Sequence, residues 1–168
     1  NRFLVNLVAR EDGVSNLAPA TRWGFFPGMS GGWNLHNEKF YKGSKVAKYV
    51  NTLKPRISYG VNGNITNIGP YDVQGVFGSQ GNYNGIGGYL NTGVVNSNLT
   101  WEQSKTTDIG ADFGLFKNRV TVAFDYFNRV TSNLLTSLTL PSYVGFSSIT
   151  TNLGTLQNRG FEISINAR

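Results

Sequence analysis

The sequence predicts an all-β protein, a sector of a large antiparallel transmembrane β-barrel with long extracellular loops. Apolar and polar residues alternate with a period of two over many segments, for example in "TTDIGADFGLFKNRVTVAFDYF" at residues 106–127. Charged residues make up only 14% of the 168 residues, compared with about 25% in soluble domains. Glycine (21 residues) and aromatic residues (13%) are plentiful. This profile argues against a helical protein, and the aromatic content argues against a disordered one.

Six segments have the alternating pattern of a β-strand. In the quoted stretch, Ile109 and Phe113 share one face, whereas Asp108 and Asp112 share the other. A break at residues 117–118 makes this stretch a hairpin. The predicted strands are residues 2–10, 23–35, 53–62, 100–116, 119–135 and 160–168.

The connections between these strands differ greatly in length. Residues 11–21, 63–99 and 136–159 form long connections, whereas residues 37–52 and 117–118 form shorter ones. If all neighbouring strands are antiparallel, the three long connections lie at one end and the two shorter ones at the other. Outer-membrane barrels have long extracellular loops and short periplasmic turns. Because closing a barrel takes about eight strands, six strands indicate one sector of a larger barrel.

The polar positions of the predicted strands bear on whether the apolar face meets lipid or a protein core. Opposite charges that face a common lumen can pair across neighbouring strands of a barrel. A soluble sandwich shows the same alternation, so this pattern alone leaves both possibilities open. The side chains expected to face the lumen are Lys54, Arg56, Asp108, Asp112, Asp125 and Glu162.

The spacing of two tryptophans favours lipid. Trp23 and Trp33 have the same parity and are ten residues apart, which is roughly 33 Å along a strand. With a tilt of about 40°, this length projects to roughly 25 Å, the height of the lipid-facing band of a barrel. Amphipathic aromatic residues anchor at the two membrane interfaces. The predicted interface aromatics are Trp23, Trp33, Tyr59, Trp101 and Tyr126.

Two prolines do not suit the predicted strands. Pro27 and Pro55 fall in the middle of strands, where each removes a donor from the hydrogen-bonded ladder. Bulges or strand edges accommodate such residues, but the sequence alone offers no firm account of either.

The sequence gives no support for catalysis. His36 is the only histidine and lies at a predicted strand end. Asp108 and Asp112 are separated by about 13 Å of strand, too far to share a proton or bind one metal ion. The glycines of "GSQGNYNGIGGY" lack the Lys-Ser/Thr of a phosphate-binding loop, and without cysteine there is no thiolate site. We therefore expect no catalytic residue, no metal and no cofactor.

The formal charge of +6 raises the question of nucleic acid. Much of the excess lies in residues 39–56, and no nucleic-acid-binding motif accompanies it, so we expect no nucleic-acid partner. The segment "NEKFYKGSKVAKYV" at residues 37–50 suggests a short helix with solvated lysines, and Phe40 and Val46 packed on the strand ends. We interpret this segment as a basic connector; a dedicated binding helix is the alternative.

Aromatic residues in the longest connection are candidate substrate contacts. Tyr71, Tyr83 and Tyr89 lie among asparagines, glutamines and glycines. Aromatic faces with nearby amide groups suit sugars or peptide backbones. Packing within the loop or at a subunit boundary is an equally good interpretation of these tyrosines.

Several strings closely resemble one family. They are "RWGFFPGMSGGWNLHNEKF" (22–40), "LKPRISYGVNGN" (53–64), "NLTWEQSKTTDIGADFGLFKNRVTVAFDYFNRVTSNLL" (98–135), "LPSYVGFSSITTNLGTLQNRGFEISI" (140–165) and, more loosely, "LVAREDGVS" (7–15). In these strings the chain is similar to the SusC/RagA family of TonB-dependent transporters of the Bacteroidetes outer membrane. The resemblance implies that residues 1–168 are part of the C-terminal half of one barrel domain of about twenty-two strands, without the plug domain, the TonB box or the closing strand. The family string more often has leucine where this chain has Pro55.

The resemblance also implies partners and a function. A TonB–ExbB–ExbD motor would act on the plug, a SusD-like surface lipoprotein would cap the barrel, outer-membrane lipid would surround it, and SusC–SusD pairs would form oligomers. The expected function is TonB-dependent nutrient uptake, the active import of glycan oligomers or peptides. The alternatives are a passive porin-like barrel and a soluble β-sandwich or adhesin module.

Overall fold

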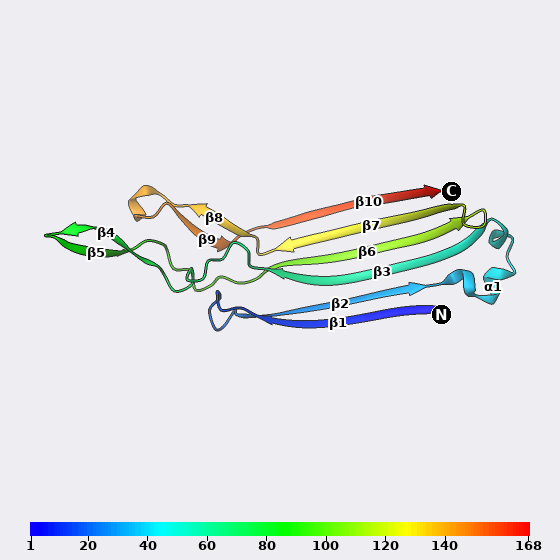
Figure 1. The fold of residues 1–168 in the computed structure, drawn as a ribbon, viewed down its shortest axis with the longest axis horizontal. Coiled ribbons are helices and arrows are strands. Elements are labelled where there is room, and N and C mark those ends of the chain that lie inside the picture. Colours follow the sequence, from blue (N-terminus) through cyan, green and yellow to red (C-terminus); the bar gives the residue numbers. More distant parts are fainter.

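Six long strands form one antiparallel sheet in the order β1-β2-β3-β6-β7-β10. The computed structural model describes residues 1–168, apart from the side chain of Gln80. Figure 1 shows the long strands side by side, with both termini at the same end. Their bounds are β1 (Phe3–Gly13), β2 (Trp23–Trp33), β3 (Val50–Asn64), β6 (Glu102–Leu115), β7 (Val120–Ser132) and β10 (Thr155–Ala167).

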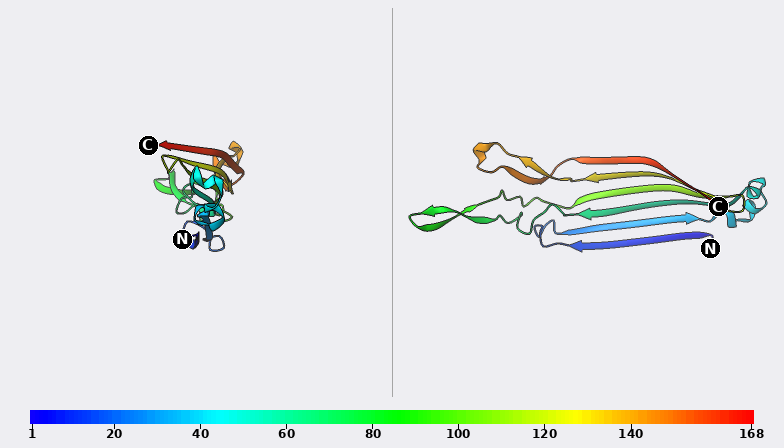
Figure 2. Two further views of the ribbon diagram at one scale, coloured as in Figure 1. Left: turned by 90° about the vertical axis from the view of Figure 1, so that its right-hand side faces the viewer. Right: turned by 45° about the horizontal axis from the view of Figure 1, so that its top comes forward.

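The connections confirm the prediction that the long connections lie at one end of the sheet and the shorter ones at the other. At the loop end, two hairpins extend past the long strands (Figure 2): β4 (Phe77–Tyr83) with β5 (Ile86–Asn91), and β8 (Leu135–Thr139) with β9 (Ser148–Asn152). A 3₁₀ turn, η3 (Ser142–Val144), lies between β8 and β9. The sequence analysis did not predict these hairpins.

The turn end, which we define as residues 1–2, 34–49, 116–119 and 168, is much more compact. Its longest segment joins β2 to β3 and contains η1 (Leu35–Asn37), α1 (Lys39–Lys42) and η2 (Lys45–Lys48). No helix within the described part of the chain has the length and apolar character needed to cross a membrane.

The ladder register aligns the apolar residues of successive strands. One row runs from Pro55 through Ala111 and Phe124 to Ile163. We call the face that carries this row the outer face and the opposite one the inner face. The rows two residues further along the strands, in either direction, repeat this arrangement because side chains alternate between faces along every strand.

The outer face is not covered by protein in the described chain. Phe3 and Phe161, at its two edges, are 64% and 68% exposed. A β-sandwich would bury such residues against a second sheet, and an apolar surface of this extent indicates contact with a membrane or another protein. The arrangement therefore does not support the soluble sandwich or adhesin alternative. Other exposed apolar residues of this face are Val5, Leu7, Phe25, Met29, Ile57, Ile109, Ile163 and Ile165.

The buried core of the described chain lies at the loop end. It joins the β1–β2 connection, the β3–β6 connection and the start of β8. Leu99, at its centre, is 0% exposed. Thus the core secures the bases of three loops and leaves both faces of the central sheet open. The buried residues of this core are Leu17, Phe26, Ile68, Val73, Leu99, Trp101 and Leu135.

The two prolines border a short ladder. β2 and β3 pair only from Gly28 opposite Gly60 to Gly32 opposite Arg56. Pro27 directly precedes the first of these pairs, and Pro55 lies just beyond the last. Each proline remains in register with the strand on its other side. Because a strand residue directs its N–H to one neighbour only, each missing donor falls where the β2–β3 ladder has ended.

Arginine substitution tests the assignment of the outer face. Ala111 lies mid-strand on the outer face of β6, so Ala111→Arg in the full-length protein would place a charge in hydrocarbon. We expect the free energy of unfolding to fall by about 2–4 kcal/mol, measured by denaturant titration of protein folded in phospholipid vesicles. Ala123→Arg is the matched control, because Ala123 lies on the inner face opposite Asp112. Equal losses in the two variants would contradict the assignment.

Candidate functional site

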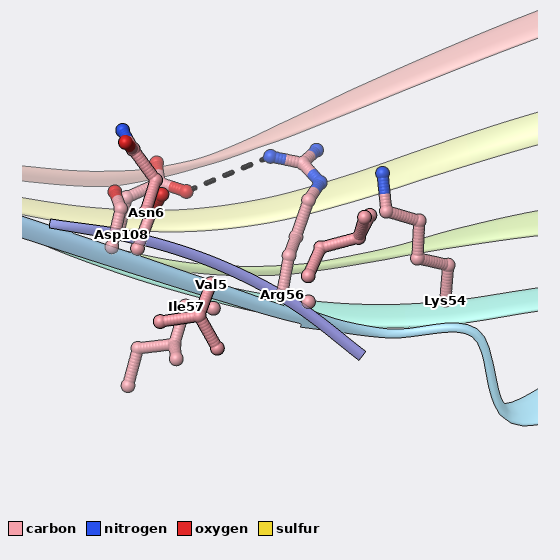
Figure 3. Close-up of a pocket in the computed structure, with 11 residues that line it drawn as sticks. Val5, Asn6, Lys54, Arg56, Ile57 and Asp108 are labelled. Carbon is pink, nitrogen blue, oxygen red and sulfur yellow. Dashed lines mark ion pairs between the residues drawn. The ribbon is translucent and has the colours of Figure 1, made fainter. Parts of the chain in front are cut away.

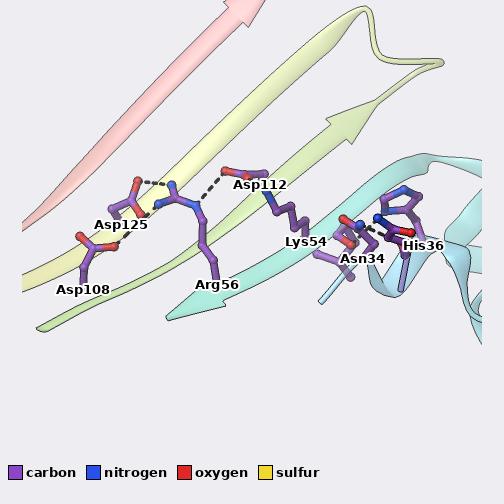
Figure 4. Close-up of polar contacts among 9 residues, drawn as sticks. Asn34, His36, Lys54, Arg56, Asp108, Asp112 and Asp125 are labelled. Carbon is purple, nitrogen blue, oxygen red and sulfur yellow. Dashed lines mark hydrogen bonds and ion pairs between the residues drawn. The ribbon is translucent and has the colours of Figure 1, made fainter. Parts of the chain in front are cut away.

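An ion cluster occupies the inner face of the sheet. Arg56, on β3, lies among three aspartates from β6 and β7 (Figure 4). Its Nη2 is 2.6 Å from Asp125 Oδ2, its Nε is 3.2 Å from Asp112 Oδ1, and its Nη1 is 3.7 Å from Asp108 Oδ1. Lys54 Nζ is 4.0 Å from Asp112 Oδ2. Since each of these groups is half-buried, the pairing compensates charges that water reaches only in part.

Gly110 makes room for this cluster. It is the register partner of both Arg56 and Asp125, and a Cβ atom there would overlap Asp125 Oδ1 and lie 3.0 Å from Arg56 Cζ. The glycine therefore allows the guanidinium to cross the strand between them. The sequence analysis did not identify Gly110; the signal was a glycine between two aspartates on one strand face.

The residues predicted to line the lumen share the inner face. Five of them form the ion cluster, and Glu162 on β10 is the register partner of Asp125. Figure 3 shows part of this face, where Asn6, Lys54 and Asp108 point to the side opposite Ile57. These side chains line a shallow hollow over β1, β2 and β3. The grouping on one face is observed, whereas their contact with a barrel lumen stays a prediction.

Four of the five predicted interface aromatics lie on the outer face. Trp23 and Trp33 stand at opposite ends of β2, and the Trp33 indole donates to Glu38 Oε1 over 3.3 Å. Tyr59 and Tyr126 are partly exposed. The Trp33 ring also stacks on Phe3, with 5.8 Å between ring centroids. Placement at a membrane interface stays a prediction for these four residues.

Trp101 is placed differently, and the prediction for it requires correction. Its side chain is only 6% exposed and belongs to the loop-end core. The indole N–H donates to Arg22 O over 3.3 Å, and the ring packs edge-on against Phe26 at 5.2 Å. β6 begins at Glu102, so Trp101 precedes the strand and its parity does not determine the direction of the side chain.

Polar contacts reinforce the loop bases around this core. Thr21 Oγ1 donates to Leu99 O over 2.7 Å, so the β1–β2 connection is held to the β3–β6 connection. The Asn152 amide accepts from Thr100 N and donates to Thr100 O, both over 2.9 Å. Asn16 Nδ2 donates to Ile68 O over 3.0 Å. The loops thus rise from a fixed base at the loop end.

The candidate substrate tyrosines lie beyond that base and do not converge. Tyr83 and Tyr89 are 87% and 74% exposed, and Tyr71 is exposed as well. Tyr83 pairs with Ile86, whereas Tyr89 lies three residues further along β5 and pairs with Ser79. Tyr83 and Tyr89 therefore project from opposite faces of the β4–β5 hairpin and do not form one flat aromatic surface.

The described residues show no arrangement suited to metal binding. They contain no group of three or more His, Asp or Glu side chains able to hold an ion. The His36 Nδ1 lies 3.2 Å from Leu53 O, so the ring is attached to the end of β3 rather than to a serine and an acid. The three aspartates on the inner face pair with the Arg56 guanidinium and do not form a metal site.

A sheet with one exposed apolar face, one charged face and long loops at one end defines a segment of an integral outer-membrane β-barrel. The sequence model of the family described as TonB dependent receptor-like, beta-barrel matches residues 1–168. The chain therefore belongs to the TonB-dependent receptor β-barrel family, which consists of transporters and not enzymes. This family membership confirms the expected outer-membrane location.

Individual relatives agree with this family. The chain is 39% identical to TonB-dependent receptor P3 of Formosa agariphila and 35% identical to TonB-dependent receptor SusC of Bacteroides thetaiotaomicron, over 100% of its own length in both cases. It spans 17% of the length of each of these relatives. These likenesses confirm the resemblance to SusC.

Solved structures show the same fold. A chain in the structure of the RagAB peptide transporter superposes with a TM-score of 0.87 at 26% sequence identity, covering 99% of this chain and 18% of that one. The RagAB peptide importer in the closed-closed state gives a TM-score of 0.88 at the same identity and coverage. The six-stranded sheet with its loops is thus a segment of a SusC/RagA-like barrel.

Alanine at Gly110 tests the packing of the ion cluster. In the full-length protein, Gly110→Ala should lower the free energy of unfolding by about 1–3 kcal/mol, the usual cost of overpacking, because Asp125 and Arg56 must move apart. Denaturant titration in vesicles measures this change. Gly60→Ala is the control, since a Cβ atom there meets nothing within 4 Å. A Gly110→Ala protein as stable as Gly60→Ala would show that the cluster does not need the glycine.

Proposed function

We propose that the protein containing this chain actively imports oligomeric nutrients, either peptides or glycan oligomers, across the outer membrane in a TonB-dependent manner. The observation that carries the proposal is the match of the whole chain to the TonB-dependent receptor barrel family. The RagAB structures, described as a peptide transporter or importer, support peptides as the first substrate class to examine.

The chain would be one sector of a larger barrel. β1 and β10 each pair with one neighbour in the described sheet, which leaves an edge on each side for further strands of the longer protein. The inner face would line the lumen. Its charged side chains would meet the plug that the family resemblance implies.

A SusD-like surface lipoprotein would meet the loop end, and TonB–ExbB–ExbD would act through the plug. The loop-end core supports this arrangement because it holds the β4–β5 and β8–β9 hairpins on a fixed base. Tyr83 and Tyr89 are exposed on opposite faces of the β4–β5 hairpin. These two faces would contact the substrate and the lipoprotein separately. We expect SusC–SusD-like pairs to assemble further.

Uptake by cells tests the proposed function. Cells that express the full-length protein should accumulate a fluorescent oligopeptide or oligosaccharide, and deletion of TonB or of the partner lipoprotein should reduce uptake to the level of cells lacking the barrel. Comparing the two probes identifies the substrate class. Uptake that persists without TonB would instead indicate a passive porin-like barrel and refute active import.

Substitution of loop tyrosines tests the substrate contacts. The double variant Tyr83→Ala/Tyr89→Ala should raise the half-saturating concentration for uptake about twofold to tenfold, as expected for loss of aromatic contacts worth about 0.5–1.5 kcal/mol. Tyr71→Ala is measured in parallel. Tyr143→Ala is the matched control, because Tyr143 is equally exposed but lies in the β8–β9 connection. If Tyr143→Ala has the same effect as the double variant, the proposed contacts are not specific.

A further inference from the structure

The positive charge of the chain is concentrated at the turn end. The chain has 15 basic and nine acidic residues. Eight of the basic residues lie at the turn end with one acidic residue, Glu38, which gives a formal charge of +7 there. The remaining seven basic and eight acidic residues give −1, so the net charge of +6 arises entirely at the turn end. The eight basic residues are Arg2, Lys39, Lys42, Lys45, Lys48, Lys117, Arg119 and Arg168.

These charges are not compensated within the chain. All eight side chains are exposed, and among the described residues Arg2 alone of the eight forms an ion pair, with Glu38 at 3.8 Å. Two cations on the inner face, Lys54 and Arg56, are instead paired with aspartates. An uncompensated cluster of this size attracts an anionic surface.

The connector between β2 and β3, which carries four of these lysines, is fixed to the strand ends by side-chain contacts. Tyr41 is buried, and its hydroxyl donates to Val50 O over 2.9 Å; burial raises the pKa of this phenol, which keeps it protonated as a donor. Ser44 caps η2 by accepting from Ala47 N over 3.3 Å. His36 lies 3.2 Å from Leu53 O. The lysines therefore stand on a segment fixed to the strand ends.

Exposed apolar residues accompany the lysines and continue the outer face. The Phe40 ring lies 6.3 Å from that of Trp33, which in turn stacks on Phe3. Tyr49 is exposed beside Lys48, whose Nζ lies 5.8 Å from its ring centroid. Aromatic residues flanked by lysines are typical of segments that lie in the membrane interface, where the aliphatic part of lysine packs on apolar groups and the ammonium reaches the headgroups.

We propose that the turn end is a binding surface for anionic phospholipid headgroups in the membrane leaflet that it meets. The cations occupy the strand ends of β1, β7 and β10 as well as the β2–β3 connector, which matches an extended rim of lipid better than one compact partner. They begin where the lipid-facing band ends, at Phe3 and Trp33. Clusters of four to eight basic residues next to a membrane segment bind anionic lipids by charge.

Lipid selectivity of the full-length protein tests this proposal. The protein is reconstituted into phosphatidylcholine vesicles with a trace of spin-labelled phosphatidylglycerol or spin-labelled phosphatidylcholine, and the protein-bound fraction of each probe is measured. We expect the unaltered protein to prefer phosphatidylglycerol roughly threefold or more, and high salt to reduce the preference. Replacing the four connector lysines should abolish most of it: Lys39→Gln, Lys42→Gln, Lys45→Gln and Lys48→Gln.

Two control variants make the outcome decisive, and heat-dependent gel mobility verifies that each variant is folded. Replacing the same four lysines by arginine keeps the charge and should keep the preference. A second variant removes four charges far from the turn end and should also keep it: Arg10→Gln, Lys105→Gln, Arg129→Gln and Arg159→Gln. Equal loss in this variant, or no preference in the unaltered protein, would overturn the proposal. A preference unchanged by the connector substitutions would overturn it as well.

Discussion

Backbone hydrogen bonding in hydrocarbon is the constraint on which the rest of this structure depends. A segment inside a bilayer must satisfy every N–H and C=O group within the protein, and β-strands achieve this only through ladders with their neighbours. The long pairings of β3 with β6 and of β6 with β7 meet this requirement along most of their length. The prolines respect the same constraint, because Pro27 and Pro55 occur where the β2–β3 ladder stops.

Because side chains alternate along each strand, apolar and charged residues are separated onto opposite faces of the sheet. Apolar side chains of neighbouring strands form continuous rows on the outer face, whereas Arg56 and the aspartates meet on the inner face. A charge on the inner face is stabilised by partners on adjacent strands, and Gly110 supplies the space that their contact needs. The two ends of the sheet do not follow this alternation. Buried residues pack beneath the loops at the loop end, and uncompensated lysines lie at the turn end.

Much of the fold follows from local pattern alone. Strands such as β6 and β7 were predictable because Ile109, Phe113 and Asp112 alternate without interruption, and the inequality of the ends followed from connection lengths. The grouping of the candidate lumen side chains on one face of the sheet was predictable for the same reason. Trp101 was not, because parity carries no information once a residue lies outside a strand. The separation of Tyr83 from Tyr89 depends on the β4–β5 turn that pairs Tyr83 with Ile86, and the sequence analysis did not predict this hairpin.

The central claim is that alternate residues of these strands face lipid and an aqueous interior. Residues 120–127 of β7 can be replaced one at a time by cysteine in a cysteine-free background of the full-length protein and spin-labelled after folding into vesicles. We predict that accessibility to oxygen is high at even positions, including Val122 and Phe124, and that polar reagents favour odd positions such as Thr121. Uniform accessibility along the strand, or the opposite alternation, would contradict the assignment of the two faces.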